Sequence, residues 1–297
     1  MLRLLPLAVL WPTSGLAEPA TSEIVVTGKE RANTLSNALE ELRIAETGDQ
    51  LARWRNRPCL SFSGWEAAYE VALDDALNQT FDRYFAGSPN PPGCRPNVEI
   101  VLTRDAGKYV DTLRQRAGRL YRQFPLQSRQ RAEGSPDAVR ILMGARTVNE
   151  DGRLAYSPGG LRPPPGLEVL AGLGEVIVQG TGVGNSRIGT SVFRENVVAL
   201  VIVDFHKSSG VSLSSLADYI ALRLLTGASD GAPANHESIL DLFAIQTDGS
   251  EGPTSFSRFD LALLEGFAEL PATARSSRQI SALARSMRPK LETTAPD

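Results

Sequence analysis

The stretch that decides the fold runs from Val197 to Leu225, VVALVIVDFHKSSGVSLSSLADYIALRLL. Residues 197–205 (VVALVIVDF) are apolar on both faces of an extended chain, which predicts a strand buried on both sides of a sheet. Ser212 is a suitable N-cap, and the apolar stripe that follows predicts a helix over about 213–226 that packs on that strand. A strand covered in this way predicts a layered protein of sheet and helices.

The segments on either side of this unit extend the pattern. Residues 98–103 (VEIVLT), 139–148 (VRILMGARTV) and 175–179 (EVIVQ) have the branched side chains of strands, and 190–193 (TSVF) with a turn at 194–196 predicts a hairpin into 197–205. Helical periodicity is found near 33–45 and at about 64–85, 105–124, 237–244, 258–269 and 276–287. We therefore expect an α+β fold, with a mixed sheet packed by helices and a helical C-terminal third.

The first residues have the three parts of a secretory signal. A basic start at Arg3 is followed by the apolar run 4–11 (LLPLAVLW) and by small residues before Glu18. We expect cleavage after Ala17, an extended segment over 18–32, and one α+β domain over 33–290. An alternative within it is a helical N-terminal subdomain over 33–95, and 291–297 should form a disordered tail. The mature protein is then periplasmic or secreted, without a transmembrane segment.

Composition and cysteine content agree with that location. The formal net charge of −3 gives no reason to expect a nucleic-acid partner. Cys59 and Cys94 are the two cysteines of the chain, and an even pair in an oxidising compartment predicts a disulfide. Two free thiols are the alternative.

Few residues stand out as chemical candidates. Glu66, Glu70 and Asp74 recur every four residues along one helix edge, where they form either a metal or acid/base site or a solvated face. Asp218 and Tyr219 lie on the polar edge of the helix at 213–226 and are further candidate polar positions. No HExxH or GxSxG motif occurs, so neither a zincin site nor a serine nucleophile elbow is indicated, and we expect no cofactor or metal.

Three resemblances add to this interpretation. Leu216–Tyr219 (LADY), 238–243 (SILDLF) and 259–266 (FDLALLEG) resemble motifs of a group of uncharacterised secreted proteobacterial proteins. The arrangement is also similar to zincin-like domains that have lost their metal ligands, which would imply an inactive relative. Separately, residues 23–28 (EIVVTG) are similar to the TonB box of outer-membrane transporters, an extended segment that adds a strand to TonB.

Three functions follow as expectations. The first is a non-catalytic binding or interaction protein of the cell envelope, whose partner is an envelope protein or a small molecule. The second is a hydrolase with an unrecognised or degenerate zincin-like site. The third is an accessory of TonB-dependent transport that acts through residues 23–28.

Overall fold

The computed structural model describes residues 35–44, 50–85, 90, 92–149, 169, 192–229, 231–234, 236–244 and 252–292. The expected signal peptide, the cleavage after Ala17, the segment 18–32 and the strand at 175–179 lie outside these ranges. Of the disordered tail predicted over 291–297, residues 293–297 also lie outside them, whereas residues 291 and 292 are the last two of a helix, so the predicted start of the tail is wrong. Within them, no helix is long and apolar enough to cross a membrane.

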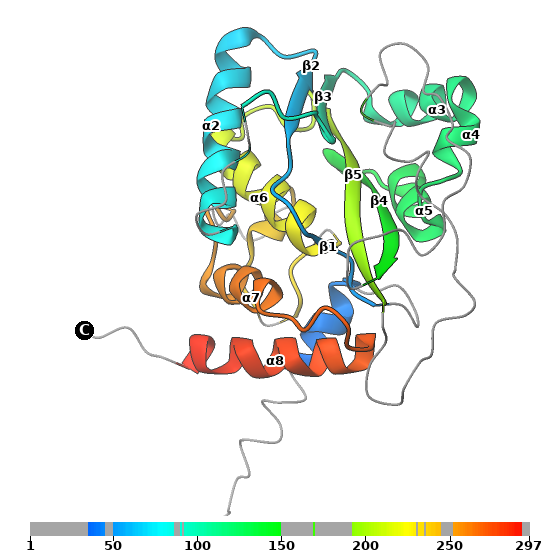
Figure 1. Cartoon of the computed structure of the whole chain (residues 1–297). Coiled ribbons are helices and arrows are strands. Elements are labelled where there is room, and N and C mark those ends of the chain that lie inside the picture. The colour runs from blue at the N-terminus through cyan, green and yellow to red at the C-terminus, as the bar shows by residue number, and fades with distance from the viewer. Residues whose placement is uncertain are drawn as a thin grey trace, which may run out of the picture.

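The described chain forms an α+β fold around a mixed five-stranded sheet. The strands are β1 (Arg53–Trp54), β2 (Leu60–Ser63), β3 (Val98–Thr103), β4 (Val139–Asn149) and β5 (Val192–Asp204). β5 is central: it pairs in parallel with β1 and with β3, β3 pairs in parallel with β2, and β4 runs antiparallel along the other side of β5. β1, β2 and β4 each pair with a single strand, so all three are outer strands (Figure 1).

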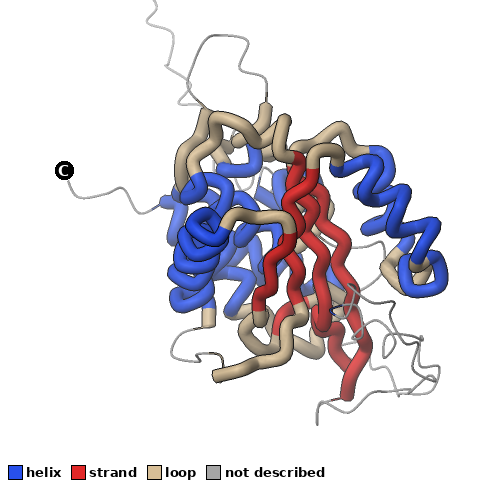
Figure 2. The backbone as a smooth tube through the Cα atoms, turned by 90° about the horizontal axis from the view of Figure 1, so that it is seen from above, coloured by secondary structure: helices blue, strands red, loops and turns tan. Residues whose placement is uncertain are grey.

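Helices cover both faces of the sheet, as Figure 2 shows. One layer holds the helical segment 35–41, α2 (Ala67–Tyr84), α6 (Leu213–Thr226), the short helix η2 (Ile239–Asp241), α7 (Arg258–Ala268) and α8 (Ser276–Glu292). The other holds α3 (Ala106–Arg116), α4 (Gly118–Tyr121) and α5 (Leu126–Gly134).

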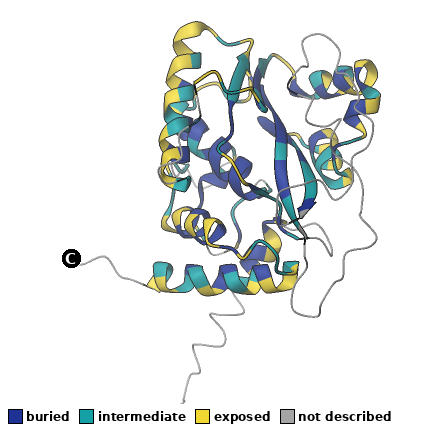
Figure 3. Ribbon diagram, viewed as in Figure 1, coloured by how far each residue is buried: buried dark blue, intermediate teal, exposed yellow. Residues whose placement is uncertain are grey.

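The alternation of β5 divides the core in two. Ala199, Val201 and Val203 pack with the α2–α6 layer, whereas Val198, Leu200 and Ile202 pack with the α3–α5 layer. All six side chains are fully buried, as the dark ribbon in Figure 3 shows. The expectation that 197–205 is buried on both faces is confirmed for residues 198–204. Val197 is only partly buried, and Phe205, which follows the end of β5 at Asp204, is 52% exposed.

The predicted turn at 194–196 is wrong. Residues 192–204 form one continuous strand, and Glu195 and Asn196 are buried in it. Glu195 is tolerated there because its Oε1 accepts a hydrogen bond from Arg146 Nε on β4 at 2.5 Å. The sequence predicts a turn at this charged residue because the arginine that pairs with it lies on another strand, far away in the sequence.

The helix predicted over 105–124 is also divided. α3 ends at Arg116, α4 starts at Gly118, and Ala117 between them adopts a non-helical backbone conformation. α5 and the short strands β1 and β2 were not predicted, because few apolar residues mark them. The segment predicted as a helix over 237–244 contains only the three residues of η2.

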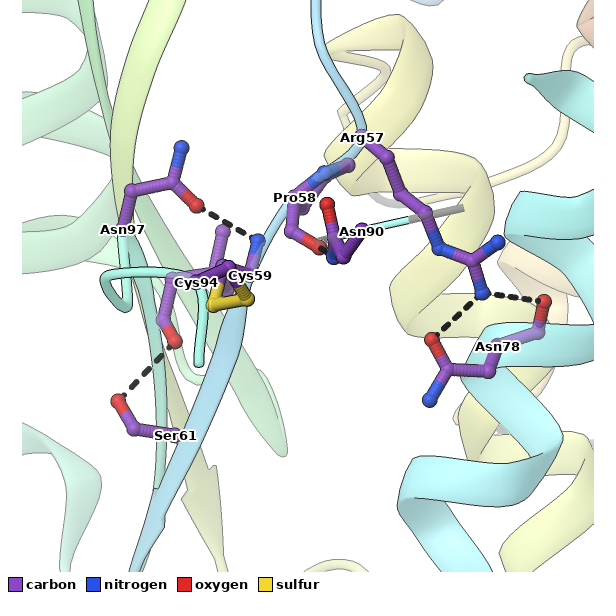
Figure 4. The surroundings of a disulfide bond; sticks show 9 residues. Arg57, Pro58, Cys59, Ser61, Asn78, Asn90, Cys94 and Asn97 are labelled. Carbon is purple, nitrogen blue, oxygen red and sulfur yellow. Dashed lines mark hydrogen bonds between the residues drawn. A yellow bond between two sulfur atoms is a disulfide. The ribbon is translucent and has the colours of Figure 1, made fainter. Parts of the chain in front are cut away.

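The disulfide between Cys59 and Cys94 is present (Figure 4). It joins the residue before β2 to the segment before β3. The covalent loop that it closes therefore contains β2 and α2. Asn97 Oδ1 accepts a hydrogen bond from the Cys59 amide at 2.8 Å, and Asn90 donates to the Pro58 carbonyl at 2.7 Å. The bridge thus reinforces the start of the parallel pair β2–β3.

Candidate functional site

The carboxylates predicted on α2 lie along one helix, and the structure does not assemble them into a metal site. Glu66 is exposed at the N-cap, while Glu70 and Asp74 are half-buried. Burial and the neighbouring Asp75 raise the pKa of Asp74, and Asn78 and Arg57 act in the opposite direction. No cluster of three His, Cys, Asp or Glu residues suited to a metal is found within the described ranges.

Arg57 is the main cation near these carboxylates. Its guanidinium donates to the side chain and carbonyl of Asn78, forms an ion pair with Asp82, and lies over the ring of Phe81. Figure 4 shows Arg57 reaching from the segment before the disulfide to α2. These contacts attach α2 to the disulfide region, which is a structural role.

Asp218 lies elsewhere, in a junction between α6 and α7. Its Oδ2 accepts a hydrogen bond from the Phe256 amide at 3.3 Å. Burial raises the pKa of Asp218, with Arg83 opposing that shift and Asp260 adding to it. Asp218 and Asp74 therefore have different electrostatic neighbours, and the structure does not bring these two candidates together.

Asp260 was not singled out from the sequence, yet it organises this junction. It is fully buried and accepts hydrogen bonds from the Ser238 hydroxyl at 2.5 Å and from the amides of Ile239 and Ser257, both at 2.8 Å. It also completes the capping box of α7. The SILDLF and FDLALLEG segments are thus joined directly, by the Ser238–Asp260 hydrogen bond.

Tyr219 lies in a third region of the molecule, next to a cleft. Its ring is buried edge-on against Phe243, and its hydroxyl accepts a hydrogen bond from Arg223 Nη1 at 2.8 Å. Burial raises the pKa of this phenol, so it stays neutral at physiological pH. Arg223 Nη1 also donates to the Val139 carbonyl at 2.9 Å, and the guanidinium lies over the Tyr219 ring.

The cleft beyond Arg223 runs along the outer side of β4, and we call it the edge cleft. It has a volume of about 980 Å³. Its walls come from the helical segment 35–41 and the residues after it, α5, the loop before β4, β4 itself and the end of α6. The charged residues in these walls are Glu40, Glu41, Arg43, Arg131, Asp137, Arg140 and Arg223. A smaller cavity of about 90 Å³ adjoins it and shares Arg43, Arg131, Ile141 and Arg223.

The register of β4 explains why polar groups gather at this edge. The Asp204 amide bonds the Ala138 carbonyl, so residues 139, 141 and 143 direct their backbone groups away from β5. Arg223 binds the Val139 carbonyl, and Ser128 Oγ accepts from the Met143 amide at 3.0 Å. Arg131 spans the edge, donating to the carbonyls of Arg43 and Gly227. Side chains thereby satisfy backbone groups that an outer strand leaves unpaired.

Arg140 is the most deeply placed cation on the α5 side of the cleft. Its side chain is about nine-tenths buried, since only 8% of the residue is exposed. Nη1 donates to the Ala132 carbonyl at 2.6 Å, and within the described structure the buried Nε has no hydrogen-bond partner. Asp137 is half-buried in the same cleft, where burial raises its pKa and Arg223, Arg140 and Lys207 lower it.

Comparison with known proteins gives no relative for this arrangement. No protein-family model matches the chain, and neither a curated protein nor a solved structure matches it.

The edge cleft was not predicted from the sequence. The sequence is rich in basic residues over 108–131, but such a run is typical of a solvated helix face, and of its basic residues only Arg131 lines the cleft. Arg140 and Arg223 lie within strongly apolar strand and helix patterns. Their meeting depends on the pairing of β4 and the packing of α6, which no local pattern encodes.

Proposed function

We propose that this chain is an exported, non-catalytic binding protein of the cell envelope and that the edge cleft holds its ligand or the contacting group of its partner. The observation that carries the proposal is the cleft itself. Its volume falls within the range of small-molecule sites, and its walls combine anchored guanidinium groups with carboxylates. Such groups fix the orientation of a bound polar molecule.

The rigidity of the walls supports a binding role. Arg223 is held by the Val139 carbonyl and by the Tyr219 hydroxyl, so little side-chain entropy remains to be lost when a ligand is bound. Tyr219, selected from the sequence as a candidate polar position, acts here as a positioning residue for Arg223. The disulfide supports the exported location, because such bridges form and persist in oxidising compartments.

Site-specific photo-crosslinking in native cells tests the proposal. A photoreactive amino acid replaces Gln130, an exposed residue of α5 that lines the cleft. The matched control replaces Gln115, an exposed residue of α3 that does not line it. Adducts are identified by mass spectrometry of the recovered full-length protein, for small molecules and proteins alike.

We expect a defined adduct at position 130 and none at position 115. Equal labelling at both positions, or no adduct at either, would contradict a binding role for the cleft. The same experiment on a chain without residues 23–28 tests the TonB-related alternative, since those residues lie outside the described ranges. Loss of the adduct on that deletion would favour the transport accessory.

A further inference from the structure

Ile141 is the residue of β4 whose backbone lies at the outer edge of the sheet beside the edge cleft. The Asp204 amide bonds the Ala138 carbonyl, so residues 138, 140 and 142 form the hydrogen-bonded pairs with β5. The amide and the carbonyl of Ile141 therefore point away from β5, toward the side along which the cleft runs. Ile141 is partly exposed, and it lines both the edge cleft and the smaller cavity that adjoins it.

The outward backbone groups on either side of Ile141 already have partners. Arg223 Nη1 donates to the Val139 carbonyl at 2.9 Å, and the Met143 amide donates to Ser128 Oγ at 3.0 Å. Within the described residues, by contrast, no hydrogen bond is formed by the amide or the carbonyl of Ile141. Ile141 thus presents one donor and one acceptor together at a strand edge that borders the cleft.

A donor and an acceptor presented by one strand residue match a particular chemical partner. In an antiparallel pair, two opposite residues exchange both of their N–H···O bonds. A residue of an extended peptide placed opposite Ile141 donates to its carbonyl and accepts from its amide. A carboxylate ion offers acceptors only and would leave the Ile141 carbonyl without a donor. The backbone at this position therefore favours a peptide over a simple anion.

The side chains around Ile141 limit the length of such a segment. Arg131 of α5 spans the edge and donates to the carbonyls of Arg43 and Gly227. Together with the contacts of Arg223 and Ser128, this bridge prevents a long strand from pairing along the whole of β4. The cleft volume of about 980 Å³ is nevertheless large enough for a few extended residues.

The rim of the cleft carries charges of both signs. Glu40 and Glu41 are exposed there, and so is Arg43. A free peptide has an ammonium at one end and a carboxylate at the other, so a rim with both signs of charge suits it better than it suits an ion of one sign.

Resting on the proposed binding function, we propose that the ligand of the edge cleft is a short free peptide in an extended conformation, which pairs with Ile141 of β4 by main-chain hydrogen bonds. Because the recognised groups belong to the main chain, the site accepts peptides of different sequence. Side chains of the peptide then alternate between the two sides of the added segment.

Titration of the purified full chain with the tripeptide Ala-Val-Ala, followed by amide NMR, tests this pairing. We expect saturable shifts centred on residues 139–143, and slower hydrogen exchange of the Ile141 amide in the complex because that amide gains an acceptor. The matched control is the same tripeptide with an N-methyl group on its central valine, which removes one donor. We expect the control to bind about tenfold more weakly, as the loss of one hydrogen bond implies.

Two variants of the chain test the same pairing from the protein side. Ile141→Pro removes the amide donor, and proline is tolerated in an outer strand where the N–H is not part of the ladder. Ile141→Val keeps the donor and shortens the side chain, so it is the matched control. We expect Ile141→Pro to weaken tripeptide binding about tenfold and Ile141→Val to leave it unchanged. Circular dichroism and thermal melting establish folding, and the N-methyl comparison decides alone if Ile141→Pro unfolds.

The outcomes separate this inference from the proposed function. No saturable binding of Ala-Val-Ala, or equal affinity for the tripeptide and its N-methyl analogue, would overturn the peptide proposal. A specific Gln130 adduct in that case leaves the binding function in place, with a ligand of another class. An adduct with the mass of a whole protein would also contradict a free peptide, whereas the absence of both tripeptide binding and crosslinking contradicts both proposals.

Discussion

Replacing Asp260 with alanine is expected to destabilise the protein strongly, because it removes a buried acceptor from the α6–α7 junction. The carboxylate receives the Ser238 hydroxyl and the amides of Ile239 and Ser257, and both Asp260 and Ile239 are fully buried. Alanine leaves the Ile239 amide and the Ser238 hydroxyl as buried donors without that acceptor. Each such donor costs about 1–3 kcal/mol.

One favourable effect partly offsets this loss. Burial raises the pKa of Asp260, which means that ionisation is less favourable in the folded than in the unfolded state, despite the hydrogen bonds from Ser238, Ile239 and Ser257. Removing the carboxylate removes that cost. With two donors lost and this offset, we expect a net destabilisation of about 3 kcal/mol. At about 2–4 °C per kcal/mol for a domain of this size, the melting temperature should fall by roughly 6–12 °C.

Asp260→Asn is the matched control. Its amide oxygen can still accept from the two backbone amides, and its NH₂ group faces the Ser238 hydroxyl, which can accept as well as donate. We expect a loss of only about 1 kcal/mol. Differential scanning calorimetry and chemical denaturation measure both variants. A melting temperature for Asp260→Ala within 2 °C of that for Asp260→Asn, a margin of about 1 kcal/mol, would refute the assignment of the carboxylate as a buried acceptor.

Three further predictions concern other parts of the molecule. Replacing Cys59 and Cys94 together with serine should cost about 3–4 kcal/mol for a bridge with a sequence separation of 35, measured by urea denaturation, and an unchanged midpoint would contradict a stabilising bridge. Gly64→Ala should lower the melting temperature, because Gly64 has φ +79° and an added Cβ would lie 2.3 Å from the Leu102 carbonyl oxygen; Gly93→Ala, at a φ of +70° with open space around it, should cost less. Tyr219→Phe removes the hydroxyl that contacts Arg223 while keeping the ring on Phe243, so it should lower the yield of the crosslinked adduct at position 130 severalfold, and an unchanged yield would remove Tyr219 from the site.

The buried unit at 197–225 could be predicted from sequence because its signal is local. The apolar pattern of the strand and the N-cap and apolar stripe of the helix each lie within fewer than fifteen residues. The observed end of β5 at Asp204 and the observed start of α6 at Leu213 agree with the predicted bounds to within one residue. The disulfide was likewise predictable from the even cysteine count and the expected compartment. In each case the deciding information lies in neighbouring residues or in composition.

The remaining features depend on pairing between distant segments. A turn was predicted at Glu195, whose partner Arg146 lies on β4. Asp260 was not singled out from the sequence, because two of its donors, Ser238 and Ile239, lie about twenty residues before it. The edge cleft combines residues near 40, 137 and 223, which are far apart in the sequence and come together only in the folded structure. Tyr219 was selected from the sequence as polar, but its role depends on Arg223 and on the carbonyl that Arg223 binds.

The most direct test of the central claim is photo-crosslinking from the edge cleft in native cells. The account predicts a specific adduct when the photoreactive residue replaces Gln130 of α5 and no adduct when it replaces Gln115 of α3. Labelling that does not distinguish the two positions would contradict the assignment of this cleft as the binding site.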